Sequence, residues 1–358
     1  MQSVAGRRRE RLYRWCVTLS LVVWCCSCEL GYYAHLAGGQ AALILDCHPL
    51  SALGTDSLSG ADPERSRQVR LVKAIRTFAA REGLDTVSSY DCLYDTGGQP
   101  VGWNVSACPP DRFEPYHWSF PVVGSLPYKG FFDRDRAEAE RQDLEAAGFD
   151  VLLRPLTAYS TLGYFSDPLL SPMLEYSPDQ LAELLLHELT HTTLFISGHA
   201  EFNESLATFV GRTASEQFLR EQFGEDTPLI AQAQAKRADR SRFRAFMNGI
   251  VSELDSLYAL DLPRPEVLRQ REILFTRAQH RYRLLRDSFV VIRFDGFLEW
   301  QVNNARLMSY QRYNRDLGDF EAAYAGAGRR LDRLFELLRT CTQSDPWLCL
   351  RSMGTEKR

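Results

Sequence analysis

The sequence of 358 residues predicts an α+β fold that is predominantly helical. Apolar residues recur at helical spacing over most of the chain after Ser177, which predicts a helical half over residues 177–358. Short β-prone runs bounded by turn residues occur before it, which predicts a mixed α/β part over residues 29–176 with a small sheet. A content of 45% hydrophobic and 25% charged residues is ordinary for a globular chain that can enclose a substantial core in one or two domains.

Residues 1–28 have the pattern of an export signal. Five arginines between positions 7 and 14 are followed by an uncharged, largely apolar run of 14 residues, Trp15 to Cys28. This run is too short to cross a bilayer comfortably. Ser27-Cys28 resembles the end of a lipoprotein signal, so we expect acylation of Cys28, export, and a lipid anchor to a bacterial membrane on its periplasmic side. A simple signal peptide or an uncleaved anchor remains open, and either would also export the domain.

The mixed part alternates predicted helices and strands. Helical periodicity covers residues 64–81 and 134–147, and strands are predicted at 118–123, 150–154 and 159–162. Residues 96–115 are rich in Gly, Pro and Asn, which predicts a loop. In the helical half, periodic segments predict helices at 202–223, 231–260, 265–287, 297–314 and 320–338.

One further helix carries the most informative motif of the chain. Ser177 is predicted to cap this helix, with Pro178 at its first position, Gln180 completing a capping box, and Gly198 as its stop. The motif is His187-Glu188-Leu189-Thr190-His191. Residues four apart lie on one helix face, so both imidazoles can bind one cation while Glu188 reaches a water beside it. One Zn²⁺ ion suits such ligands and makes hydroxide available near neutral pH, so a metal-dependent hydrolase is the first hypothesis.

A third protein ligand is expected downstream of the motif. His199 and Glu201 are candidates by residue type, but the spacing of His199 does not fit the longer zincin motif that ends in a third histidine. Glu204 is the better candidate. It lies in the predicted first turn of the next helix, where the helix dipole favours a carboxylate and where it could face the motif helix across Gly198.

Several segments together resemble the bacterial aminopeptidase family, whose members are predicted lipoprotein zinc peptidases. The matching segments are Gly31–Tyr33, Gly39-Gln40, Pro127–Asp133, Ala158–Leu170, His187–His191, Phe202–Ser205, Asn303–Arg306 and Tyr313. The resemblance implies a zincin-like metallopeptidase domain over residues 29–358, with a small sheet beside the motif helix. It also implies that His187, His191 and Glu204 bind zinc, that Glu188 is the general base, and that the substrate is a peptide.

Further site residues are predicted with alternatives. Tyr313 matches the late tyrosine of the family and is the first candidate for donating a hydrogen bond to the tetrahedral oxyanion, with Tyr159 and Tyr310 as alternatives. Asn303, Asn304 and Arg306 share one predicted helix and are candidates for substrate binding or for orienting the zinc ligands; hydrogen bonding between helices is the alternative.

The third predicted strand is a candidate substrate edge. Peptidases of this kind commonly hold an extended substrate along an edge strand, which would place Tyr159, Ser160 and Thr161 against the peptide backbone. A strand that only packs is the alternative.

Cysteine spacing favours two disulfides in an exported domain. Beyond the signal region the chain has Cys47, Cys92, Cys108, Cys341 and Cys349. The closest pairs are Cys92 with Cys108 and Cys341 with Cys349, and this pairing leaves Cys47 over.

Other functional classes lack support in the sequence. A net charge of -4 gives no reason to expect a nucleic-acid partner, and the chain has no phosphate-binding glycine motif for a nucleotide and no G-x-S-x-G motif of a serine hydrolase. Two alternatives stay open. One is a zinc hydrolase that cleaves another amide, as an endopeptidase or on the cell wall, and the other is an exported scaffold that keeps the fold without catalysis.

Overall fold

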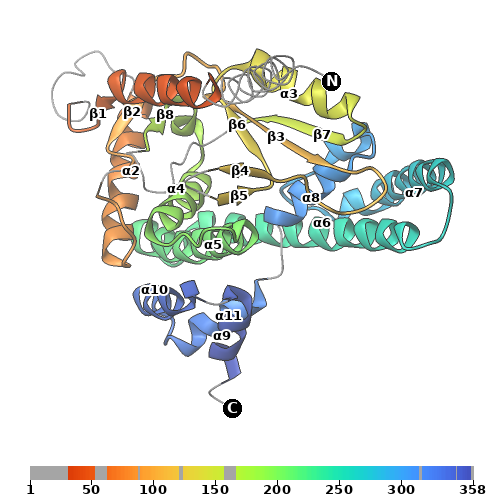
Figure 1. Cartoon of the computed structure of the whole chain (residues 1–358). Helices are drawn as coiled ribbons and strands as arrows, with labels where there is room; N and C mark the ends of the chain where they lie inside the picture. Colours follow the sequence, from red (N-terminus) through yellow and green to blue (C-terminus); the bar gives the residue numbers. More distant parts are fainter. Residues whose placement is uncertain are drawn as a thin grey trace, which may run out of the picture. The chain divides into compact units, whose positions relative to one another are not determined.

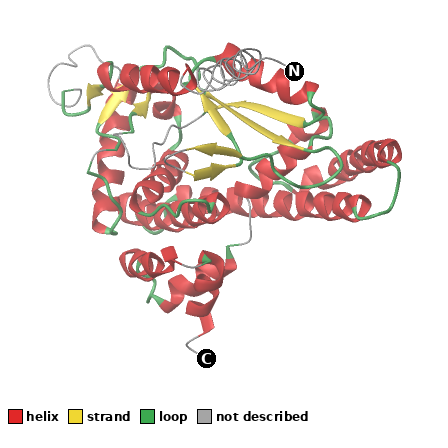
Figure 2. Cartoon of the chain, viewed as in Figure 1, coloured by secondary structure: helices red, strands yellow, loops and turns green. Residues whose placement is uncertain are grey.

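The computed structural model describes residues 31–52, 63–87, 89–120, 124–156, 167–313, 317–343 and 345–355. Helices dominate these residues and the strands form small sheets, as an α+β chain requires (Figure 2). The chain divides into two compact units, residues 1–46 and 47–358. In the first unit, residues 31–45 are helical. The second unit holds all the labelled elements.

The helices of the second unit lie mostly after residue 177. Their bounds are α2 (Pro63–Arg81), α3 (Arg134–Ala146), α4 (Pro178–Thr193), α5 (Ala200–Phe223), α6 (Pro228–Tyr258), α7 (Arg264–Leu285), α8 (Asn304–Tyr313), α9 (Gly318–Gly326), α10 (Leu331–Arg339) and α11 (Pro346–Thr355). Short 3₁₀ turns cover η1 (Ser171–Glu175), η2 (Arg286–Ser288), η3 (Asp295–Glu299) and η4 (Thr340–Gln343).

The strands are short and pair in three groups among the described residues. They are β1 (His48–Pro49), β2 (Cys92–Tyr94), β3 (Trp103–Cys108), β4 (Trp118–Phe120), β5 (Gly124–Leu126), β6 (Lys129–Phe131), β7 (Asp150–Pro155) and β8 (Leu169–Leu170). One sheet has the order β1-β2-β8, with β2 parallel to β8, and a second has the antiparallel order β6-β3-β7. β4 and β5 form an antiparallel pair. Helices α3 and α8 both pack against β3 and β7 (Figure 1).

Helices α4 and α5 form an antiparallel hairpin that is central to the second unit (Figure 1). Leu181, Leu185 and Leu189 recur every four residues along α4 and are fully buried, so they form its apolar face. A separate apolar cluster joins α6, α7 and η3, with Phe243, Tyr282 and other aromatic rings in mutual contact. Among the described residues no helix combines the length and the apolar character that crossing a membrane requires.

Most predicted helices are confirmed within a few residues, whereas three predictions are wrong. The predicted loop at 96–115 contains β3, the central strand of its sheet. The predicted helix at 297–314 divides into η3 and α8, and the predicted helix at 320–338 divides into α9 and α10. The predicted strand at 150–154 is confirmed as β7, and 118–123 is described as β4 up to residue 120. The predicted strand at 159–162 lies outside the described residues.

The disulfides correct one predicted pairing. Cys341 pairs with Cys349 as expected, but Cys92 pairs with Cys47 and not with Cys108. The reason is strand pairing: β1 runs antiparallel to β2 with Pro49 opposite Cys92, which brings Cys47 to the same place. Cys108 ends β3 in another sheet, where its buried thiol donates to the backbone oxygen of Arg112 at 3.3 Å.

Candidate metal centre

The first turn of helix α4, the helix that carries the motif, is held in place by side-chain interactions. The side-chain oxygen of Gln180 accepts a hydrogen bond from the backbone nitrogen of Ser177 at 3.2 Å, which is one half of the predicted capping box. Asp179 in the first turn forms a buried ion pair with Lys236 of α6 at 2.6 Å. The helix ends at Thr193, before the predicted stop at Gly198; Gly198 instead adopts a φ of +81° in the turn that follows.

Asn203 closes the turn between α4 and α5. Its side-chain oxygen accepts from the backbone nitrogen of Ile196 at 2.9 Å, and its side-chain nitrogen donates to the Ile196 oxygen at 2.8 Å. These two bonds fix the turn against the start of α5. Because α5 begins at Ala200, Glu204 lies just past the first turn and not within it as predicted, but it does face α4.

Gly211 allows the two helices to approach closely beside the motif. A Cβ atom at this position would lie 2.8 Å from the backbone oxygen of Glu183 and 3.1 Å from the Cβ of His187. Such contacts are shorter than packed atoms adopt, so only glycine fits here without movement of a helix. The close approach brings the carboxylate of Glu204 to the imidazoles of α4.

His187, His191 and Glu204 form a group that could hold a metal ion. One donor atom from each residue lies within 4.8 Å of the other two. The Nε2 atoms of His187 and His191 are 3.4 Å and 3.7 Å from Oε2 of Glu204. Donors at about 2.0–2.1 Å from a tetrahedral zinc ion would lie about 3.3 Å apart, whereas a direct hydrogen bond would bring N and O to about 2.9 Å. The spacing therefore fits a shared cation better than direct hydrogen bonds.

Charge and burial agree with this geometry. Oε2 of Glu204 and Nδ1 of His191 are buried and make no hydrogen bond within the described residues. Burial raises the pKa of Glu204, but the adjacent histidines outweigh it and hold that pKa far below its usual value. Burial lowers the pKa of His191, but Glu204 outweighs it and the pKa ends above its usual value. A buried carboxylate that stays ionised between two imidazoles is suited to binding a cation.

Glu188 is half-buried beside this group, and its charge acts on Tyr90, a residue that the sequence did not single out. The Tyr90 side chain is fully buried, and its hydroxyl has no hydrogen-bond partner among the described residues. Burial raises the pKa of Tyr90 well above its usual value, and the charges of Glu188 and Asp167 raise it further. Asp167 is also fully buried, and its backbone oxygen accepts from the backbone nitrogen of Tyr90 at 2.7 Å.

Residues 31–346 match the model of one protein family, described as "Putative aminopeptidase". The chain belongs to this family. No curated protein and no solved structure is significantly similar to it. The matched residues include the whole helical hairpin, and membership suggests peptidase activity for the chain.

Three other predicted site residues of this family member hold α8 in place. Asn304 is fully buried: its backbone nitrogen donates to Asp150, and its side chain bonds to Tyr258 and to the oxygen of Pro109. The side-chain nitrogen of Asn303 donates to the oxygen of Val151 at 2.9 Å. The guanidinium of Arg306 lies over the Trp300 ring, 4.8 Å from its centre. These contacts join α8 to β7 and to the loops beside it; a role in substrate binding stays a prediction.

Several of the remaining predicted site residues, or their side chains, are not among those that the structure describes. Cys28, Tyr159, Ser160 and Thr161 lie outside the described residues. Tyr313 is described as the last residue of α8 but not in its side chain. For Tyr310, burial raises the pKa of the phenol to about 12, although three arginines of α5 and α6 act in the opposite direction.

Proposed function

We propose that this chain is a zinc-dependent peptide hydrolase with a zincin-like domain, acting as an aminopeptidase. The observation that carries the proposal is the convergence of His187, His191 and Glu204, in which the Nε2 atom of each histidine lies 3.4 Å or 3.7 Å from Oε2 of Glu204, near the spacing of tetrahedral ligands. Glu188 follows His187 directly on the same helix, and membership in the family supports a peptidase. Two nitrogen donors and one oxygen donor suit zinc, and three protein ligands leave one position for water or substrate.

Each site residue has a separate role in the proposed hydrolysis. Zinc, when bound, would act as a Lewis acid on the scissile carbonyl and lower the pKa of a water molecule. Glu188 accepts the proton of the attacking water and later delivers it to the leaving amine. The ionised Glu204 keeps a negative charge beside both imidazoles, which keeps the donor set suited to a divalent cation. Asn203 holds the turn so that Glu204 does not move away from α4.

The proposal includes export and lipid anchoring through Cys28. The two disulfides, Cys47–Cys92 and Cys341–Cys349, support an oxidising compartment, because such bonds are rare in the reducing cytosol. The substrates would then be peptides on the periplasmic side of the membrane. Neither the edge-strand role of residues 159–161 nor the role of Tyr313 as oxyanion donor is required for the central chemistry.

The central experiment combines zinc analysis with peptide hydrolysis. Bound zinc should be present in the wild type and in Glu188→Gln, because Glu188 is not a ligand in the proposal. Hydrolysis should fall by at least about 10³-fold in Glu188→Gln, since no other group takes the proton. His191→Ala should lose both zinc and activity.

A panel of peptides with free and blocked amino termini then separates the alternatives. A preference for free amino termini supports an aminopeptidase, and equal cleavage of both indicates an endopeptidase. A wild type that binds no zinc, or a Glu188→Gln chain that remains fully active, contradicts the proposed mechanism.

A further inference from the structure

The last turn of α7 and the loop after it form an exposed tip that the proposed mechanism does not use. Three apolar side chains of this tip face solvent: Leu284, Val290 and Val291 are 88%, 75% and 41% exposed. A single exposed apolar residue is ordinary on a protein surface, whereas several within a short segment form a patch that marks an interaction site. We call residues 283–293 the α7 tip.

Buried groups hold the α7 tip in one shape. The carboxylate of Asp239 in α6 is fully buried and accepts hydrogen bonds from the backbone nitrogens of residues 290–292, at 2.6–3.1 Å. The Tyr282 hydroxyl accepts from the backbone nitrogen of Phe294 at 2.9 Å, which brings the end of the loop back to α7. Phe289 is buried against the Tyr282 ring. The valines of the loop therefore stay at the surface unless these contacts break.

Charged side chains join the two ends of the α7 tip. Oδ1 of Asp287 lies 3.7 Å from Nε of Arg286 and 3.7 Å from Nη2 of Arg293. Arg283 is exposed and forms no ion pair within the described residues; its guanidinium donates to Nδ1 of His280 at 3.3 Å. The α7 tip is therefore compact, with arginines next to its apolar side chains.

Positive charge is in excess around the α7 tip. Residues 277–295 include five arginines and two carboxylates. Helix α6 adds Arg242, which lies 3.0 Å from Asp239, and Glu253, which lies 2.9 Å from Arg281. Six arginines therefore meet four carboxylates in this described part of the second unit, although the chain as a whole has a net charge of -4.

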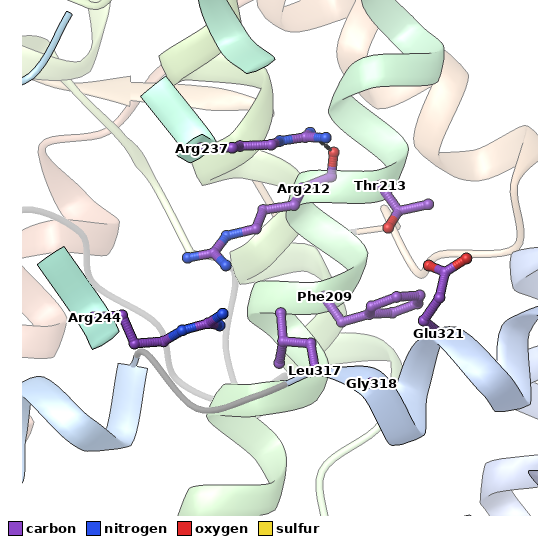
Figure 3. A pocket seen from close by; sticks show the side chains of 8 residues that line it. All are labelled: Phe209, Arg212, Thr213, Arg237, Arg244, Leu317, Gly318 and Glu321. Atoms are coloured by element: carbon purple, nitrogen blue, oxygen red, sulfur yellow. Dashed lines mark hydrogen bonds between the residues drawn. The ribbon is translucent and has the colours of Figure 1, made fainter. Parts of the chain in front are cut away.

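Not every arginine near these helices is available to an external anion. Arg237 of α6 forms an ion pair with Glu216 and also donates to the backbone oxygen of Arg212 in α5. Figure 3 shows the second of these bonds. Arg283 and Arg293 differ from Arg237, because both side chains are exposed at the α7 tip and can contact an anion outside the protein.

We propose that the α7 tip docks on the surface of an anionic phospholipid bilayer. Leu284, Val290 and Val291 enter the region between the lipid headgroups and the acyl chains, and the neighbouring arginines contact lipid phosphates. An apolar patch flanked by arginines suits this interface, because the apolar side chains bury their area while the guanidinium groups stay among the anionic headgroups. The docking needs neither zinc nor hydrolysis, so it goes beyond the proposed function and is tested independently of it.

The test reads lipid contact at the α7 tip itself. An environment-sensitive fluorescent amino acid replaces Val290 in the full chain, which keeps the backbone nitrogen that donates to Asp239. The chain is mixed with vesicles of phosphatidylglycerol and phosphatidylethanolamine that contain lipids brominated on their acyl chains. The fluorophore should be quenched, and the quenching should weaken in high salt and on brominated vesicles of phosphatidylcholine alone. The matched control carries the same fluorophore at Leu260, an exposed apolar residue at the other end of α7, and should not be quenched.

Arginine substitutions measure the electrostatic part of the docking. Arg283→Gln combined with Arg293→Gln should lower the ratio of docked to undocked chain by about 30-fold, since one arginine near an anionic surface contributes a factor of about five. Arg264→Gln combined with Arg269→Gln removes the same charge from the start of α7 and should leave this ratio unchanged.

The melting profile of each variant is compared with that of the wild type, so that loss of docking is separated from loss of folding. Absence of quenching at position 290, or equal quenching at positions 290 and 260, overturns the proposal. Equal quenching on anionic and neutral vesicles, unaffected by loss of Arg283 and Arg293, rules out the anionic surface as the partner. Sedimentation that finds a dimer broken by Val290→Arg, in a chain without quenching, assigns the α7 tip to a second copy and also overturns the proposal.

Discussion

The glycine between the motif helix and its partner controls the separation of α4 and α5. We expect Gly211→Ala to destabilise the chain by about 1–3 kcal/mol, because the added methyl group meets the Glu183 backbone oxygen at 2.8 Å. We also expect weaker zinc binding, since the same contact moves His187 relative to Glu204. Thermal unfolding and zinc titration measure both effects.

Gly249 supplies the control for this substitution. It is exposed in α6, and a Cβ there would meet no atom within 4 Å. Gly249→Ala should therefore stabilise the chain by up to about 1 kcal/mol through helix propensity, with zinc binding unchanged. Equal behaviour of the two variants would contradict the packing role of Gly211.

The buried tyrosine in the environment of Glu188 offers a second prediction at this scale. Tyr90→Phe removes a hydroxyl without a hydrogen-bond partner among the described residues, so stability should rise by about 1 kcal/mol. We expect kcat to fall by about tenfold, because that hydroxyl lies in the field of the proposed base and is a candidate donor to the reacting groups. Melting curves and peptide kinetics measure the two effects.

Tyr324→Phe is the matched control, because Tyr324 is equally buried but its hydroxyl accepts from Gln217 at 2.9 Å. Loss of the Tyr324 hydroxyl should lower stability and leave kcat unchanged. A Tyr90→Phe chain that loses stability and keeps its kcat would refute the assignment.

The sequence predicts those residues of the candidate site that lie close together along the chain. His187, Glu188 and His191 follow from helical spacing alone, and Glu204 follows from the next helical pattern. Tyr90 could not be predicted, because it precedes Glu188 by almost 100 residues and has a φ of +59°, which nothing in the local sequence demands. Gly211 carries a weak signal as a glycine inside a helical pattern, which often marks close packing.

At the scale of elements, the loop after α7 is attached to α6 by one carboxylate. Asp239 accepts hydrogen bonds from the backbone nitrogens of residues 290–292, at 2.6–3.1 Å. Burial raises the pKa of Asp239, but these backbone nitrogens and Arg242 outweigh it and the pKa ends below its usual value. Asp239→Asn should cost about 1–3 kcal/mol at neutral pH, since the charged acceptor is lost.

The pH dependence of this effect has a definite sign. A carboxylate whose pKa is lowered in the folded state stabilises that state fully above its unfolded pKa, about 3.9, and the contribution disappears as the pH falls through the lower folded value. The difference in the free energy of unfolding between the wild type and Asp239→Asn should therefore become smaller below about pH 4. Denaturant melts at several pH values test this, with the exposed Asp255→Asn of α6 as control. A difference independent of pH would show that Asp239 does not act through its charge.

The wrongly predicted elements have physical reasons. The sequence of strand β3 lacks the usual alternation of apolar and polar residues, since Asn104 and Ser106 are buried polar residues. Its pairing partners, β6 and β7, also lie far along the chain. Helix α9 ends at Gly326, and Gly328 two residues later adopts a φ of +70° that does not continue a helix. That signal is present in the sequence, but the apolar periodicity on both sides of it resembles one continuous helix.

At the scale of the whole molecule, the Cys47–Cys92 disulfide joins two residues that are 45 positions apart in the sequence. Cys47→Ser should lower stability by about 2–4 kcal/mol, because the cross-link restricts the unfolded chain. Peptide mapping of the oxidised protein should find Cys47 joined to Cys92, and Cys108 as a thiol. Cys108→Ser serves as control, since burial raises the pKa of that thiol to about 12 and it carries no cross-link. A map that joins Cys92 to Cys108 would contradict the strand pairing.

Anchoring is also tested on the whole chain. We expect labelled palmitate to be incorporated into the wild type and not into Cys28→Ser, and the variant should leave the membrane fraction. Cys26→Ser, which the signal pattern does not select for acylation, is the control. A membrane-bound Cys28→Ser chain would indicate an uncleaved anchor.

The hairpin of α4 and α5 also affects the order in which the protein folds. Its two imidazoles and its carboxylate come from residues 187–204, so bringing them together closes only a short loop and costs little chain entropy. A cation could therefore assemble this hairpin before the distant strands β3 and β7 have paired. In the exported zinc enzyme that we propose, metal supply would then determine how fast the chain matures, as well as whether it is active.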